Sequence, residues 1–173
     1  MELQKIRELV RDIEDFPTPG IIFRDITPLL ANPQAFNTVL DMMAEPYINK
    51  KIDHIAAIDA RGFIFGSAIA RSLGAGFIPL RKKGKLPYKK VSDSYSLEYG
   101  INEIEMHIDA IKEGENVLIV DDLLATGGTL KAACNLVEQL KGNVVGISLL
   151  IELTALEGRK NLINYQVDTV LEY

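Results

Sequence analysis

Two adjacent acids precede a short glycine-containing segment in "VLIVDDLLATGGT", residues 117–129. The glycines let the backbone approach a ligand closely, and the threonines add hydroxyl donors. A helix beginning here would direct its first N–H groups, which lack partners within the helix, toward an anion. A turn that only packs a helix onto a sheet is the alternative, but the acids and threonines favour function. The segment thus predicts a phosphate-binding loop without the lysine of a P-loop, formed by Ala125, Thr126, Gly127, Gly128 and Thr129.

The acids Asp121 and Asp122 constrain what the ligand can be. A carboxylate about 6 Å from a phosphate charge, at an effective dielectric constant of about 20, costs roughly 3 kcal/mol, or about a hundredfold in affinity. The acids should therefore face hydroxyl groups or a cation beside the phosphate. A sugar phosphate offers both, because its ribose presents paired hydroxyls and a metal ion commonly accompanies polyphosphates.

The elements around these residues can be predicted from hydrophobic periodicity. Compact apolar runs predict buried strands at 52–59, 76–80, 116–122, 143–151 and 167–171, and helical spacing predicts helices at 62–74 and after Gly128. This alternation predicts an open, mostly parallel twisted α/β sheet flanked by helices. Ligands bind such sheets beyond the carboxyl ends of the strands. One rim should therefore carry Asp59–Arg61, Arg81 and Asp121–Thr129.

Two further segments flank this pattern. Helical spacing of Leu3, Ile6, Val10 and Ile13 predicts an N-terminal amphipathic helix, and a second helix is predicted to follow Asn32 as its N-cap. Pro79 predicts that the end of the strand at 76–80 lies near a sheet edge. The polar stretch 81–100 and the alternating stretch 101–108, a half-exposed strand by its pattern, together predict a flexible hairpin lid.

Length and composition limit the class of protein. The 173 residues suit one domain, with 47% hydrophobic residues and a formal net charge of −5. This charge argues against nucleic acid as the main partner. One cysteine rules out a disulfide within the chain, and the absence of a long apolar run predicts no membrane helix. We expect a cytoplasmic protein.

The stretch "VLIVDDLLATGGT" closely resembles the 5-phosphoribosyl-1-pyrophosphate (PRPP) motif of type I phosphoribosyltransferases. By this resemblance, Asp121 and Asp122 bind the ribose hydroxyls, and Ala125 to Thr129 hold the 5-phosphate. Successive side chains of a strand point to opposite faces. If both acids meet one ribose, the chain should already be leaving the strand there.

Other stretches resemble the adenine-specific branch of this family, in the family's order. They are "FPTPGIIFRDITPLL" (16–30), "ARGFIFG" (60–66), "RKKGKLP" (81–87), "SYSLEYG" (94–100) and "IELTALEGRKNL" (151–162). The resemblance implies a homodimer in which adenine and PRPP give AMP and pyrophosphate, with Mg²⁺ held by PRPP and not by the protein. It also implies one domain, 1–173, with residues 1–35 as N-terminal helix and base-binding hood and 81–108 as the lid. "GRKNL" lacks the acid that the resemblance implies after Gly158 and Arg159.

The leaving pyrophosphate needs cations, because negative charge builds up on it in the transition state. The guanidinium of Arg61, on the turn after a buried strand, suits phosphate oxygens. The resemblance makes this turn the pyrophosphate loop and implies a cis peptide around Asp59–Ala60. A solvated basic loop is the alternative for residues 81–90. Beside a PRPP motif, pyrophosphate binding is the better interpretation, by Asp59, Ala60, Arg61, Arg81, Lys82 and Lys85.

The adenine site rests largely on the resemblance. Glu98 is implied as the acid/base that handles the ring proton of adenine, with Arg61 as the other catalytic residue. An exposed loop glutamate is the alternative for Glu98, and a buried loop anchor is the alternative for "IIFRD" (21–25). Apolar, aromatic and cationic side chains suit a purine. The residues predicted to line the base are Ile22, Phe23, Arg24 and Leu153.

Two rival functions remain at this stage. One is a phosphoribosyltransferase for hypoxanthine, guanine or xanthine, which turnover with each base would reveal. The other is a PRPP-sensing regulator, which would bind PRPP without turnover. Such regulators usually add a DNA-binding domain, and the roughly fifty residues before the first predicted core strand lack a basic helix-turn-helix pattern.

Overall fold

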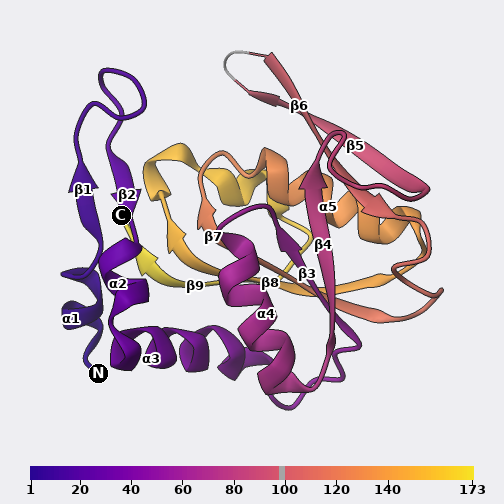
Figure 1. The fold of residues 1–173 in the computed structure, drawn as a ribbon, viewed down its shortest axis with the longest axis horizontal. Coiled ribbons are helices and arrows are strands. Elements are labelled where there is room, and N and C mark those ends of the chain that lie inside the picture. The colour runs from indigo at the N-terminus through magenta and orange to yellow at the C-terminus, as the bar shows by residue number, and fades with distance from the viewer. Residues whose placement is uncertain (98–99) are drawn as a thin grey trace. The chain divides into compact units, whose positions relative to one another are not determined.

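The computed structural model describes residues 1–97 and 100–173 (Figure 1). Its helices are α1 (Leu3–Arg7), α2 (Thr27–Ala31), α3 (Pro33–Ala44), α4 (Gly62–Leu73) and α5 (Gly128–Gln139). The 3-10 turns are η1 (Glu45–Tyr47), η2 (Thr154–Leu156) and η3 (Gly158–Leu162). The strands are β1 (Arg11–Ile13), β2 (Phe23–Asp25), β3 (His54–Ile58), β4 (Gly76–Lys82), β5 (Lys90–Leu97), β6 (Gly100–His107), β7 (Asn116–Leu124), β8 (Asn143–Glu152) and β9 (Val167–Glu172). No helix in the described ranges is both long enough and apolar enough to cross a bilayer.

Contacts divide the chain into two units, Met1–Met42 and Met43–Tyr173. The second unit contains a seven-stranded sheet in the order β5-β6-β4-β3-β7-β8-β9. The pairs β3–β4, β3–β7, β7–β8 and β8–β9 are parallel, whereas β6 is antiparallel to both β4 and β5. The predicted mostly parallel sheet flanked by helices is therefore confirmed.

The strand order reverses between β3 and β7. From β3 the chain runs through α4 to β4 on one side, and from β7 it runs through α5 to β8 on the other side. Right-handed crossovers in opposite directions place the two helices on opposite faces of the sheet. In Figure 1, α4 lies in front of the sheet and α5 behind it. The carboxyl ends of β3 and β7 therefore flank a topological switch point, where ligands of such sheets bind.

The central strands are buried on both faces. Ala56, Ile58, Val117 and Ile119 belong to the core cluster that also includes the apolar side of α5. Because side chains alternate along a strand, Ile55 and its neighbours of the same parity face α4 instead. Burial on two faces explains why these strands read as continuous apolar runs.

The N-terminal unit differs from its prediction. Helix α1 ends at Arg7, and Arg11–Ile13 forms strand β1, which pairs antiparallel with β2. The prediction of one helix through Ile13 was wrong, because pairing with β2 overrides the local spacing. The predicted cap of α3 is confirmed, since Asn32 Oδ1 accepts a hydrogen bond of 3.0 Å from the Ala35 N–H.

The lid region is a hairpin of β5 and β6. Strand β4 extends to Lys82 and β5 begins at Lys90, so much of the predicted loop 81–100 is strand. Strand β4 lies inside the sheet order, but β6 pairs with it only at Arg81 and Lys82. Pro79 was predicted to lie near a sheet edge, but β4 lies between β6 and β3 in the sheet. The described pairing with β6 does not include Pro79.

The exposure of residues along β6 also differs from the predicted pattern. A half-exposed strand is predicted at 101–108, yet the polar residue Glu105 is only 3% exposed, whereas Ile108, just after the strand, is 41% exposed. The carboxylate of Glu105 is buried because it has partners within the fold, which are described below.

Candidate functional site

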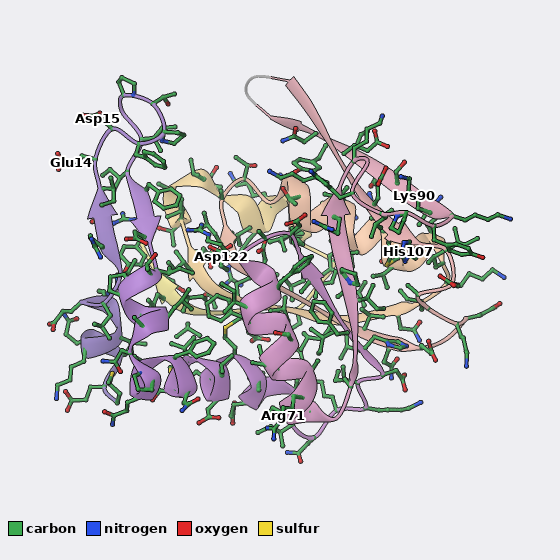
Figure 2. The ribbon with its side chains drawn as sticks, in the orientation of Figure 1. Glu14, Asp15, Arg71, Lys90, His107 and Asp122 are labelled. Atoms are coloured by element: carbon green, nitrogen blue, oxygen red, sulfur yellow. The ribbon has the colours of Figure 1, made fainter. Side chains whose placement is uncertain are left out.

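The paired acids lie within a strand. Strand β7 continues to Leu124, so the prediction that the chain leaves the strand at Asp121 and Asp122 was wrong. Asp121 Oδ1 accepts a hydrogen bond of 2.9 Å from the Asp122 N–H, and Asp122 Oδ2 lies 2.6 Å from a guanidinium nitrogen of Arg61. In Figure 2, Asp122 lies near the end of α4 that is opposite Arg71, where this helix begins.

The surroundings make both carboxyls hard to ionise. Burial raises the pKa of Asp121, and the negative charge of Asp122 raises it further. Burial also raises the pKa of Asp122, although the positive charge of Arg61 opposes this. Asp122 is only 6% exposed. A cationic or hydroxyl-bearing ligand would therefore stabilise the ionised forms of both carboxyls.

The predicted phosphate loop follows β7 directly and leads into α5. Gly127 is the residue before α5 and has φ 83° and ψ −4°, a left-handed conformation that favours glycine. A Cβ added to Gly127 would lie 2.5 Å from the carbonyl oxygen of Gly158. Helix α5 thus begins at the loop, where its free N–H groups favour an anion. The predicted strand–loop–helix arrangement for Ala125 to Thr129 is confirmed, and phosphate binding there stays a prediction.

The turn after β3 lies against the paired acids. The Asp59–Ala60 peptide bond is cis, as the resemblance implied. Arg61 precedes the first residue of α4, and a Cβ added to Gly62 would lie 2.7 Å from Asp121 Oδ1. Glycine at this position lets the start of α4 approach the end of β7 closely.

The basic residues at the end of β4 and directly after it fall into two groups. Arg81 Nε donates a hydrogen bond of 3.1 Å to Asp59 Oδ2, which connects the ends of β4 and β3. Lys83 is paired with Glu103 at 2.7 Å. Lys82 and Lys85 have no acidic partner in the part of the chain that the structure describes. These two side chains therefore keep their charge available for an anionic ligand.

Glu105 is a residue that sequence reasoning missed. Its Oε2 accepts a hydrogen bond of 3.0 Å from the Gly84 N–H and lies 3.1 Å from Lys90 Nζ. The buried carboxylate therefore holds the turn between Lys82 and Lys85 against the hairpin. No local signal identifies Glu105, because both partners come from other segments of the chain.

The predicted adenine residues belong to both units of the chain. Leu153 follows β8, and its N–H donates a hydrogen bond of 2.9 Å to the Leu124 carbonyl at the end of β7, on the predicted rim. Ile22, Phe23 and Arg24 belong to the N-terminal unit, where Arg24 is paired with Asp12 across the β1–β2 hairpin. Their contact with a base stays a prediction.

Glu98 and the neighbouring Tyr99 lie outside the described residues. The implied role of Glu98 therefore also stays a prediction. The described rim contains Asp59, Arg61, Arg81 and Asp122, which are connected by the pairs Arg81–Asp59 and Arg61–Asp122. This confirms the predicted rim at the ends of β3, β4 and β7.

Comparison with known proteins gives a consistent family. A family model described as phosphoribosyl transferase domain matches residues 25–171. An adenine phosphoribosyltransferase of Rhodopirellula baltica is 55% identical over 168 residues, which cover 97% of this chain and 82% of the relative. A crystal structure of adenine phosphoribosyltransferase from Thermoanaerobacter pseudethanolicus has a TM-score of 0.96 and 49% identity, covering 99% of this chain and 100% of that one. The Saccharomyces cerevisiae enzyme, in complex with adenine and an imino-altritol bisphosphate, has a TM-score of 0.92 and 40% identity, covering 98% of each chain.

Proposed function

The chain belongs to the phosphoribosyltransferase family, and from this premise we propose how its strand-end site binds PRPP and adenine. It is an adenine phosphoribosyltransferase, which transfers the 5-phosphoribosyl group of PRPP to adenine and gives AMP and pyrophosphate. The observation that carries the proposal is the glycine-containing loop at the start of α5, directly after the paired acids Asp121 and Asp122 at the switch point. This arrangement suits a ligand with an anionic end and a hydroxyl-bearing end.

PRPP would occupy three neighbouring positions on the rim. The 5-phosphate binds the loop Ala125–Thr129, where N–H groups at the start of α5 favour it. The ribose hydroxyls bind Asp121 and Asp122. The pyrophosphate binds the turn 59–61 together with Arg81, Lys82 and Lys85, because guanidinium and ammonium groups suit phosphate oxygens.

The chemistry separates charge between two of these positions. Breaking the bond to pyrophosphate leaves positive charge on the ribose and negative charge on the leaving group. Asp121 and Asp122 stabilise the first, and the cations stabilise the second. Arg61 connects the two positions, because it pairs with Asp122 at 2.6 Å and lies on the predicted pyrophosphate turn. The β5–β6 hairpin would close over the site and exclude water, which otherwise hydrolyses the ribosyl cation.

Magnesium is proposed to enter with PRPP. Mg²⁺ prefers oxygen ligands and commonly keeps substrate phosphates and waters. The carboxylates of Asp121 and Asp122 beside the phosphate loop fit such an ion electrostatically, while PRPP's own oxygens hold it. The ion would offset negative charge on the leaving pyrophosphate.

Leu153 is proposed to contact adenine, and the family resemblance supports the same role for Ile22, Phe23 and Arg24. Family resemblance also supports a homodimer, which light scattering of the purified protein tests.

A cytoplasmic location is proposed from the composition, which includes a single cysteine.

Glu98 is proposed as the acid/base at adenine. Glu98→Ala is expected to lower kcat at least about tenfold while the fold persists, because a positioned acid or base typically contributes about 10²- to 10⁴-fold. Steady-state kinetics with adenine measure the effect, and circular dichroism checks the fold. The matched control is Glu45→Ala, an exposed glutamate at the start of η1. Near-normal turnover of Glu98→Ala would exclude this role.

The base preference is tested directly. The protein is incubated with PRPP, Mg²⁺ and one of adenine, hypoxanthine, guanine or xanthine, and pyrophosphate release is measured. Adenine alone should support turnover. Turnover with another base and not with adenine would overturn the assignment. Tight PRPP binding without turnover of any base would favour a PRPP-sensing regulator instead.

A further inference from the structure

The phosphate loop packs on the 3-10 turn η3. Asn161 Nδ2 donates a hydrogen bond of 2.7 Å to the Thr126 carbonyl oxygen. A Cβ added to Gly158 would lie 2.3 Å from the Ala125 carbonyl oxygen, so the two backbones are in close contact. The turn η3 therefore supports the loop over several successive residues.

The turn η3 is itself anchored to the sheet. Arg159 donates hydrogen bonds of 2.7 to 2.9 Å to the carboxylate of Glu152, at the end of β8, and one of 2.8 Å to the Val167 carbonyl, at the start of β9. Leu162 is 1% exposed and belongs to the core cluster. Asn161 thus acts from a platform fixed by an ion pair on one side and by core packing on the other.

The hydrogen bond fixes the orientation of one peptide unit. The Thr126 carbonyl and the Gly127 N–H belong to the same peptide, which is trans. In a planar trans peptide these two groups point in opposite directions. Because Asn161 holds the carbonyl, the Gly127 N–H points away from η3. Without this bond, the peptide before a glycine can rotate more easily, since glycine tolerates many backbone conformations.

We propose that Asn161 is a positioning residue for the 5-phosphate of PRPP, a role that rests on the proposed function of the loop. By holding the Thr126 carbonyl, it keeps the Gly127 N–H oriented toward the phosphate. Asn161 lies in "GRKNL", the stretch that lacks the acid implied by the family resemblance after Gly158 and Arg159. The side chain is exposed, so it contributes through this bond and not through burial.

Asn161→Leu tests the proposal, because leucine has a similar size but no donor. The KM for PRPP is expected to rise about three- to tenfold, as for loss of one partly solvated hydrogen bond. The affinity for ribose 5-phosphate, measured by calorimetry, should fall by a similar factor. The kcat and the KM for adenine should stay within about twofold, because the bond acts on binding of the phosphate in ground and transition states alike.

Two further variants make the result specific. Asn161→Gln keeps an amide donor and should recover much of the PRPP affinity. Asn164→Leu, at an exposed asparagine three residues further along, should leave all parameters unchanged.

The proposal is overturned if Asn161→Leu leaves the KM for PRPP unchanged. It is equally overturned if the KM values for PRPP and adenine rise together with a lower Tm, or if Asn161→Gln behaves like Asn161→Leu. Absence of AMP synthesis by the unmodified protein would instead count against the proposed function.

Discussion

Replacing Asp121 and Asp122 together by asparagine is expected to lower kcat about a hundredfold or more, the scale of removing preorganised charge from an active site. Asparagine can still hydrogen-bond to ribose hydroxyls, but it carries no negative charge to stabilise a cationic ribose. The fall in kcat should therefore exceed the loss of PRPP affinity. Steady-state kinetics and calorimetric PRPP titration give the two numbers. Equal losses would mean that the acids only anchor the ribose.

The paired acids Asp121 and Asp122 should lower the free energy of unfolding of the ligand-free protein. Burial and the charge of Asp122 raise the pKa of Asp121 above its ordinary value. Below about pH 4 the carboxyl is protonated in the folded and unfolded chains alike. As the pH rises, the unfolded chain loses this proton first, so stability falls until the pH passes the raised folded pKa.

Asp121→Asn removes this penalty and should raise the Tm at pH 8. Each kcal/mol relieved corresponds to about 2–4 °C in a chain of this size. The gain should disappear below about pH 4, where the native carboxyl is neutral. Thermal unfolding at both pH values measures it, with Asp41→Asn, an exposed aspartate on α3, as control. A lower Tm at pH 8 would contradict the penalty.

The cost of burying two acids explains why the cation Arg61 lies beside Asp122. Asp122 is buried, and its pairing with Arg61 at 2.6 Å compensates part of the cost. Two like charges at the end of β7 nevertheless remain unfavourable until a ligand arrives. Active sites commonly sacrifice stability in this way.

The rim could be predicted from the sequence because its signals are local. Apolar runs identify buried strands, and the residues that follow each run lie at strand ends. Parallel strands then bring Asp59, Arg61, Arg81 and Asp122 to one edge, as the structure confirms. The cis peptide at Asp59–Ala60 came from family resemblance and not from any local rule.

The contacts that support the rim could not be predicted, because they join distant segments. Asn161 lies 35 residues from Thr126, and nothing in "GRKNL" indicates that bond. The burial of Glu105 depends on the Gly84 N–H and on Lys90, so alternation along β6 alone does not show that the second face is covered at this position. The prediction of an N-terminal helix through Ile13 was wrong for the same reason, because Arg11–Ile13 pairs with a distant strand at Phe23–Asp25.

Gly127→Ala is expected to raise the KM for PRPP about a hundredfold, by two separate effects on the phosphate loop. A non-glycine residue at φ 83° costs about 1–2 kcal/mol in backbone strain. The added Cβ would also lie 2.5 Å from the Gly158 carbonyl oxygen, so the loop must move away from η3. If the ligand-free loop relaxes to escape both effects, PRPP binding must restore its geometry at a cost of about 3 kcal/mol, and each 1.4 kcal/mol is about tenfold in affinity.

Gly114→Ala separates the two effects. Gly114 has φ 84°, nearly the same as Gly127, but an added Cβ there would meet no atom within 4 Å. Both variants should therefore lose stability through backbone strain, whereas only Gly127→Ala should weaken PRPP binding. Thermal unfolding and PRPP kinetics on the two proteins give the comparison. A Gly127→Ala protein with lowered Tm but ordinary KM for PRPP would mean that the 5-phosphate does not depend on this loop geometry.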